Sequence, residues 1–171
     1  LMHGGLEIVG RLADFTSIIC DLKVADIPNT AQLIAEAAYG AGAAGIIAHA
    51  FPGAGPLQAI RNVAPERDLY AVITMSHPGG GEFFDIPGLV AVAREGGATG
   101  VVAPATRPED IATVRAAVGD LTIISPGVGA QGGDPRAAIA AGADMVIVGR
   151  AIYQADDPGS AARDFARALG D

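Results

Sequence analysis

The chain has 171 residues and a formal net charge of −8; half of its residues are apolar and 5% are aromatic. This length suits one domain with a substantial core, which we expect to span residues 1–171. It has no basic cluster that could follow a nucleic-acid backbone, and no apolar run approaches the roughly 20 residues that cross a bilayer. We therefore expect a cytoplasmic protein that binds neither nucleic acid nor a membrane.

Short apolar, β-branched runs alternate with alanine-rich stretches along the chain. After a first helix near Leu6–Ala13, we expect strands that are each followed by a helix. In chain order these are strand Ser17–Asp21 and helix Thr30–Ala41, strand Gly45–His49 and helix Pro56–Val63, strand Leu69–Met75 and helix Gly88–Glu95, strand Gly100–Ala103 and helix Arg107–Val118, strand Leu121–Ser125 and helix Pro135–Ala141, and strand Asp144–Gly149 and helix Gly159–Leu169. Continuously apolar strands that each lead into a helix are typical of a parallel sheet covered on its faces.

The loops differ between the two ends of this predicted sheet. Those that leave the strands carry unusual chemistry, as in DLKVADIPNT, HAFPGAG, MSHPGGGEFFDIPG and SPGVGAQGGDP, whereas those that return to the strands, such as AGAAG and AGAD, are short and plain. In barrels and open α/β sheets, the loops after the carboxyl ends of the strands hold the active site.

The segment GVGAQG at 127–132 matches the dinucleotide fingerprint G-x-G-x-x-G. It follows the fifth predicted strand instead of the first, and the next strand ends in Gly149 and Arg150 instead of an acidic residue. A phosphate site fits better, because in many barrels the last two strand-to-helix loops bind phosphate through backbone N–H groups. Arg150 would add a bidentate guanidinium. The alternative is that the glycines serve tight turns and Arg150 is a surface charge.

Lys23 is the only lysine among eleven basic residues, and the other ten are arginines. A lysine kept in so arginine-rich a chain points to a task that guanidinium cannot perform, such as giving up a proton. Asp21 and Asp26 bracket it, and two carboxylates would hold the ammonium charged yet able to deliver a proton. An ordinary ion pair at the sheet edge is the alternative. His49 ends the second predicted strand, where we expect it to shape the floor of the pocket.

The segment DLKVADIPNT resembles the D-x-K-x-x-D-I-P-x-T signature of the orotidine 5′-phosphate decarboxylases, especially the compact archaeal type. The likeness continues in register through AHAFPG, ITMSHPGG, PATRPE, ISPGVGAQGGDP and IVGRAIYQADDP and covers nearly the whole chain. It implies a (β/α)₈ TIM-type barrel of the ribulose-phosphate-binding kind. It also implies decarboxylation of orotidine 5′-monophosphate to UMP, a step of pyrimidine biosynthesis, without metal or cofactor and in a homodimer.

The same resemblance assigns roles to residues. Asp21 would lie against the substrate carboxylate, Lys23 would protonate C6 as CO₂ departs, and Asp26 would reach the site of the neighbouring subunit. The remaining substrate-binding positions that it implies are Ile27 and Thr30 at the dimer interface, Met75 and Ser76 at the pyrimidine, Pro126, Val128 and Gln131 in the phosphate-side loop, and Gly149 and Arg150 at the phosphate.

Two features of the family pattern have no counterpart here: an aspartate on the first strand that binds the ribose, and a further lysine on the second. We therefore expect a barrel that lacks its first two strands, with six βα units present. The missing segment would be roughly 40–50 residues, the size of a strand–helix–strand unit. We expect this chain to be an N-terminally truncated form of a longer product that is more stable and far more active.

Two other functions stay open at the level of sequence. The hexulose-phosphate synthases and ketogulonate-phosphate decarboxylases carry a similar D-x-K-x-x-D segment, which they use with magnesium. The runs DIPNT, MSHPGG and PGVGAQGGDP favour the nucleotide enzyme over these lyases. The second alternative is a catalytically inactive barrel remnant that binds a nucleotide monophosphate.

Overall fold

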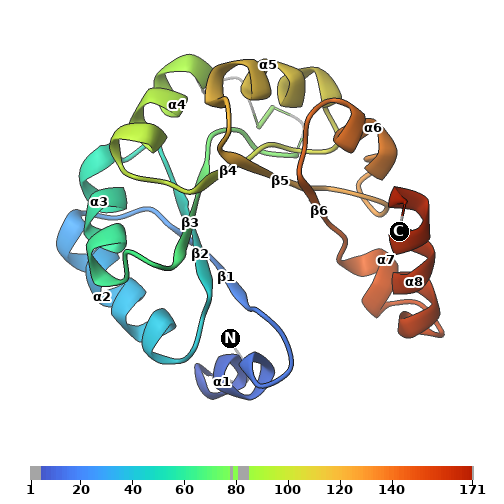
Figure 1. Ribbon diagram of the computed structural model, residues 1–171, viewed down its shortest axis with the longest axis horizontal. Coiled ribbons are helices and arrows are strands. Elements are labelled where there is room, and N and C mark those ends of the chain that lie inside the picture. The colour runs from blue at the N-terminus through green and yellow to red at the C-terminus, as the bar shows by residue number, and fades with distance from the viewer. Residues whose placement is uncertain (1–4, 78, 81–84, 171) are drawn as a thin grey trace. The chain divides into compact units, whose positions relative to one another are not determined.

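The structure is a computed structural model that describes residues 5–77, 79–80 and 85–170 (Figure 1). Contacts group the chain into two compact units, Leu1–Ile73 with Gly88–Val101, and Thr74–Pro87 with Val102–Asp171. The strand order follows the chain, β1-β2-β3-β4-β5-β6. The expectation of a single domain over residues 1–171 stays a prediction, and each unit is described by itself below.

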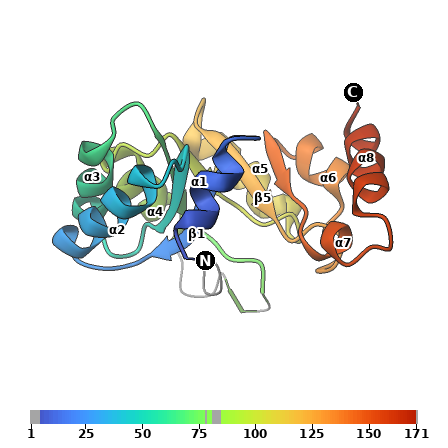
Figure 2. The same cartoon turned by 90° about the horizontal axis from the view of Figure 1, so that it is seen from below.

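The first unit supplies three neighbouring parallel strands and the helices that follow them. Its elements are α1 (Glu7–Ala13), β1 (Ile19–Val24), α2 (Pro28–Gly40), β2 (Gly45–His49), α3 (Ala54–Val63), β3 (Asp68–Val72) and most of α4 (Ile86–Glu95), and β4 (Gly100–Val102) begins in it. β2 pairs in parallel with both β1 and β3. The helices α2 and α3 lie side by side (Figures 1 and 2).

Local sequence explains how α2 and α3 meet the strands. α2 begins at Pro28, whose fixed φ suits the first turn, after Ile27 in an extended conformation. Its buried residues are Ala31, Ala35, Ala38 and Tyr39, and the three alanines let most of the helix approach the sheet closely. Leu57 of α3 is fully buried, and a Cβ added to Gly96 after α4 would lie 2.5 Å from the Leu57 Cβ. Only glycine therefore fits at that approach.

The second unit contains the carboxyl-terminal elements. They are α5 (Pro108–Val118), β5 (Thr122–Pro126), α6 (Pro135–Ala140), β6 (Met145–Ile147), α7 (Arg150–Tyr153) and α8 (Pro158–Leu169). β5 and β6 pair in parallel, with Ile124 opposite Met145. Asp134 and Asp157 cap α6 and α8 by accepting hydrogen bonds of 2.9 Å from Ala137 N and Ser160 N. Within the described ranges, no helix is long and apolar enough to cross a membrane.

The predicted elements are present, with bounds that differ from the predicted ones by up to three residues, and the differences at β1, β3 and α7 bear on the site. β1 continues to Val24 instead of ending at Asp21, because the chain bulges there and then pairs again. β3 ends at Val72 instead of Met75, because Val72 pairs with His49, the last residue of β2. The four-residue helix α7 was not predicted, because one turn is too short to show helical periodicity.

Candidate active site

The carboxyl end of β1 carries Asp21 and Lys23 on a β-bulge. The pairing with β2 passes from Asp21 opposite Ile47 to Val24 opposite Ala48, which leaves Leu22 and Lys23 as extra residues. Lys23 has a φ of 49°, in the left-handed region that a lysine rarely adopts. The contact expected between Asp21 and Lys23 forms, but through this bulge and not through regular strand alternation. Strained backbone of this kind is concentrated at functional sites in proteins.

Lys23 and Asp21 form an ion pair in which the Lys23 ammonium donates to both carboxylate oxygens of Asp21. Their side chains are 40% and 48% exposed. An ion pair so open to solvent stabilises a fold by less than about 1 kcal/mol. The pair therefore contributes little as a structural element, and it is accessible to a ligand.

The segment after β1 places the other three predicted residues of this unit. Asp26 is exposed and accepts a hydrogen bond of 2.7 Å from the backbone N–H of Ile27. Ile27 is 64% exposed, and Thr30 lies half-buried in the first turn of α2. Asp26 and Ile27 line an open hollow together with Phe51 of the loop after β2. The apolar side chains here face outward without cover from this chain.

The second unit contains Met75 and Ser76, which follow β3. Arg107 donates hydrogen bonds to the buried Thr74 hydroxyl (2.9 Å) and to the Met75 carbonyl (2.6 Å), and it pairs with Asp110. Thr106 donates to the Ser76 carbonyl at 3.3 Å. Thr106 and Arg107, just before α5, thus fix the backbone at the two residues that the family resemblance assigns to a pyrimidine.

Five predicted residues meet in one cavity of the second unit. Its volume is about 260 Å³, and the predicted residues that line it are Pro126, Val128, Gln131, Gly149 and Arg150. Backbone hydrogen bonds shape its loop, from Gly129 N to Gly133 O (3.1 Å) and from Gly133 N to Gly127 O (3.0 Å). Arg150 is exposed at the start of α7. A small cavity with one guanidinium and a glycine-rich backbone suits a phosphate group.

Gly133 is the position where this loop tolerates no side chain. A Cβ there would lie 2.7 Å from the Gly127 carbonyl oxygen and 3.0 Å from Ala105. We expect Gly133→Ala to lower the free energy of unfolding by about 1–3 kcal/mol, as overpacking against backbone does. The control is Gly40→Ala at the end of α2, where an added Cβ meets nothing within 4 Å. Urea unfolding of both variants checks this, and equal stability of the two would contradict the tight fit.

Sequence reasoning missed several residues of these two sites. Arg107 and Tyr153 are the main ones, because Tyr153 lines the phosphate-side cavity beside Arg150 and Arg107 fixes Met75. Arg107 acts across 32 residues of sequence, a distance at which spacing gives no signal. Tyr153 lies three residues after Arg150, and recognition of α7 would have placed both on one turn.

The structure brings the predicted residues together in two sets. Asp21, Lys23, Asp26, Ile27 and Thr30 lie in the first unit, and the other seven lie in the second. In the part of the chain that the structure describes, no group of three or more His, Cys, Asp or Glu side chains could hold a metal ion.

Comparison with known proteins identifies what the chain is similar to. A model of the orotidine 5′-phosphate decarboxylase / HUMPS family matches residues 1–165. The orotidine 5′-phosphate decarboxylase of Methanosarcina barkeri is 53% identical over 171 residues, which cover 97% of this chain and 77% of that protein. The same enzyme of Pyrococcus horikoshii is 44% identical over 168 residues, 95% of this chain and 79% of that protein.

Solved structures show the same likeness in three dimensions. The crystal structure of orotidine 5′-monophosphate decarboxylase from Methanocaldococcus jannaschii, complexed with the inhibitor BMP, superposes with a TM-score of 0.92 at 35% identity. The match covers 99% of this chain and 82% of that one. The fold expected from the sequence, a (β/α)₈-type barrel with six βα units in this chain, is confirmed.

Proposed function

The chain belongs to the orotidine 5′-phosphate decarboxylase / HUMPS family, and on this premise we propose that it converts orotidine 5′-monophosphate to UMP and CO₂. The observation that carries the proposal is the contact between the only lysine of the chain and Asp21 at the carboxyl end of β1. The relatives described above bear the name of this decarboxylase, so the magnesium-dependent lyases and the inactive remnant are not favoured.

Lys23 is the proton donor in this proposal. Cleavage of the bond between C6 and the carboxylate releases CO₂ and leaves the electron pair on C6. An ammonium close to C6 stabilises that charge as it develops, and its proton then forms the new C6–H bond. The resulting amine regains a proton from solvent.

Asp21 has two roles next to Lys23 in this proposal. Its carboxylate holds the Lys23 ammonium by accepting hydrogen bonds at both oxygens, which fixes the donor before the substrate arrives. It would also lie against the carboxylate of the substrate, and the repulsion between two like charges is relieved only when CO₂ leaves. Asp26 is proposed to act from the neighbouring subunit.

The phosphate of the substrate binds, in this proposal, in the cavity of the second unit. Arg150 supplies the charge, and Gln131 and the backbone around Gly149 supply hydrogen bonds. Binding energy from a group remote from C6 can hold the pyrimidine in a position that the free substrate avoids. Met75 and Ser76 are proposed to line the pyrimidine.

The direct test is an assay of the protein with orotidine 5′-monophosphate. The absorbance of the orotate ring should fall as UMP appears in stoichiometric amount. The same rate with and without a chelator would separate this enzyme from the magnesium-dependent lyases. UMP binding without turnover would instead support the remnant and contradict the decarboxylase.

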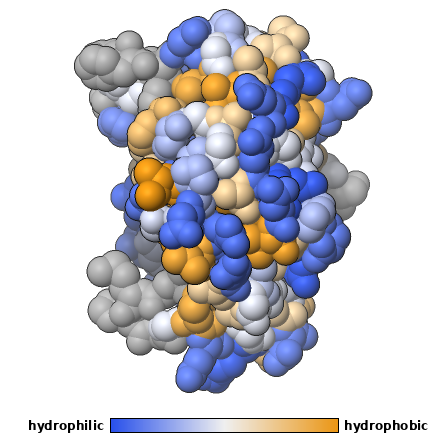
Figure 3. Space-filling view, turned by 90° about the vertical axis from the view of Figure 1, so that its left-hand side faces the viewer, coloured by the Kyte–Doolittle hydropathy of each residue, from blue (hydrophilic) through white to orange (hydrophobic). Residues whose placement is uncertain are grey.

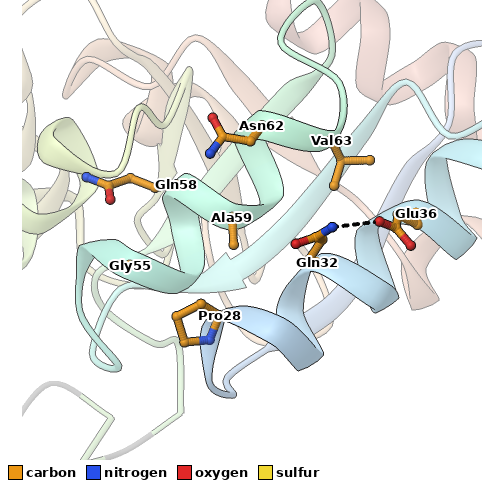
Figure 4. Close-up of a pocket in the computed structure, with 8 residues that line it drawn as sticks. All are labelled: Pro28, Gln32, Glu36, Gly55, Gln58, Ala59, Asn62 and Val63. Atoms are coloured by element: carbon orange, nitrogen blue, oxygen red, sulfur yellow. Dashed lines mark hydrogen bonds between the residues drawn. The ribbon is translucent and has the colours of Figure 1, made fainter.

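We also propose that the protein is a homodimer joined through the surface formed by α2, α3 and the loops that precede them. Figure 3 shows this side of the molecule, where apolar side chains lie exposed among polar ones. The exposed apolar residues there include Ile27 (64%), Leu33 (56%) and Phe51 (57%). A groove between α2 and α3 has both polar and apolar walls, and Gln32 and Glu36 in it are joined by a hydrogen bond (Figure 4).

Leu33→Glu should convert the dimer to monomers, because a carboxylate buried in the interface without a partner costs several kcal/mol. Leu12→Glu is the control, since Leu12 is similarly exposed on α1. Light scattering after size exclusion gives the mass of each variant. A parent protein that is already monomeric, or a Leu33→Glu variant that stays dimeric, would contradict this interface. The cytoplasmic location stays a prediction from the sequence.

A further inference from the structure

His49 is a half-buried group that lies beside the catalytic pair and has no role in the mechanism above. It ends β2 two residues after Ile47, which pairs with Asp21, so alternation along β2 puts its side chain on the Asp21 side of the sheet. Its ring packs against Phe51 with 5.2 Å between centroids and an angle of 51° between planes. The imidazole is therefore held in place at the carboxyl end of β2.

The hydrogen bonding of this ring is incomplete. In the described residues, Nδ1 of His49 is buried and has no hydrogen-bond partner. A buried polar atom without a partner is costly, and a buried charge without one costs more. Burial lowers the pKa of His49, the Lys23 charge lowers it further, and the Asp21 carboxylate opposes part of the shift. The first two effects outweigh the third, so the pKa of His49 lies below its usual value and the imidazole is uncharged at neutral pH.

We propose that His49 is a positioning residue, whose imidazole stays uncharged so that Lys23 is the single cation bound to Asp21; this rests on the proposed function. A proton on His49 would place a second positive charge toward Asp21 and draw the carboxylate away from the Lys23 ammonium. Among the described residues, Lys23 and Asp21, both of β1, are the charges that act on the ring. Protonation would thus displace the proton donor without touching the substrate.

Nuclear magnetic resonance of the imidazole nitrogens tests the charge state without turnover. The chain has three histidines, His3, His49 and His77, so ¹⁵N spectra are simple to assign, with His49→Gln identifying its own signal. We expect the His49 signals to keep the pattern of a neutral ring to a lower pH than an unperturbed histidine would, since the pKa of His49 is lowered. A His49 that is protonated at neutral pH would overturn the proposal, whether or not the protein decarboxylates its substrate.

Two substitutions then connect the charge to catalysis. His49→Gln keeps a neutral hydrogen-bonding side chain, so kcat near pH 8 should stay within about threefold of the parent, while the acidic limb of kcat moves at least about half a unit lower. His49→Lys should lower kcat at least about tenfold with a smaller change in KM. An unchanged acidic limb in the folded His49→Gln protein would overturn the positioning role. No decarboxylation by the parent would contradict the proposed function alone.

Discussion

Replacing Lys23 by arginine is expected to abolish decarboxylation while UMP binding stays within about tenfold of the parent. Arginine keeps the positive charge beside Asp21, but a guanidinium does not give up a proton at neutral pH. The loss should exceed about 10⁴-fold in kcat, because the variant loses both the proton donor and the compact charge at C6. The rate of the orotate absorbance change and calorimetric binding of UMP measure the two quantities.

The control for this variant is the opposite exchange, from arginine to lysine, at a residue that has no proposed role in catalysis or binding. Arg163→Lys on the exposed surface of α8 creates a second lysine and should leave both kcat and UMP binding unchanged. Substantial decarboxylation by Lys23→Arg would remove Lys23 from the mechanism. Loss of UMP binding in proportion to activity would show that Lys23 serves binding and not the chemical step.

Arg150→Ala is expected to raise KM for orotidine 5′-monophosphate by roughly 10²-fold, the effect of removing a charge-assisted contact to phosphate. Uridine lacks the phosphate, so its weak inhibition should be the same in variant and parent, and that comparison separates loss of the phosphate contact from distortion of the cavity. Arg163→Ala serves as the matched control for removing an exposed arginine. An unchanged KM, or equal losses for uridine and UMP, would contradict phosphate binding at Arg150.

The sequence predicted the order and type of the main elements because apolar runs and alanine-rich helical stretches differ clearly in pattern. It also predicted which residues share the phosphate-side cavity, since Pro126, Val128 and Gln131 are close in sequence and Gly149 and Arg150 come just after the next strand. The bulge at Leu22–Lys23 was not predictable, because a left-handed lysine has no signature in residue type.

Contacts between residues far apart in the sequence could not be predicted either. Arg107, directly before α5, holds the Met75 carbonyl through its guanidinium, and only the fold brings these two residues together. His49 could be placed at a strand end from the sequence, but its unpartnered Nδ1 depends on how neighbouring side chains fill space. Packing of this kind is decided by three-dimensional contacts that periodicity does not encode.

The left-handed backbone at Lys23 means that the residue type that would be most stable at this position differs from the one that the proposed chemistry needs. For a residue with a Cβ, the left-handed region is less stable by roughly 1–2 kcal/mol, whereas glycine adopts it freely and asparagine at a smaller energetic cost. Natural or laboratory selection for heat resistance alone would therefore favour replacement of the proposed proton donor. Ancestral or consensus designs meant to stabilise this chain need to exclude position 23 from the search.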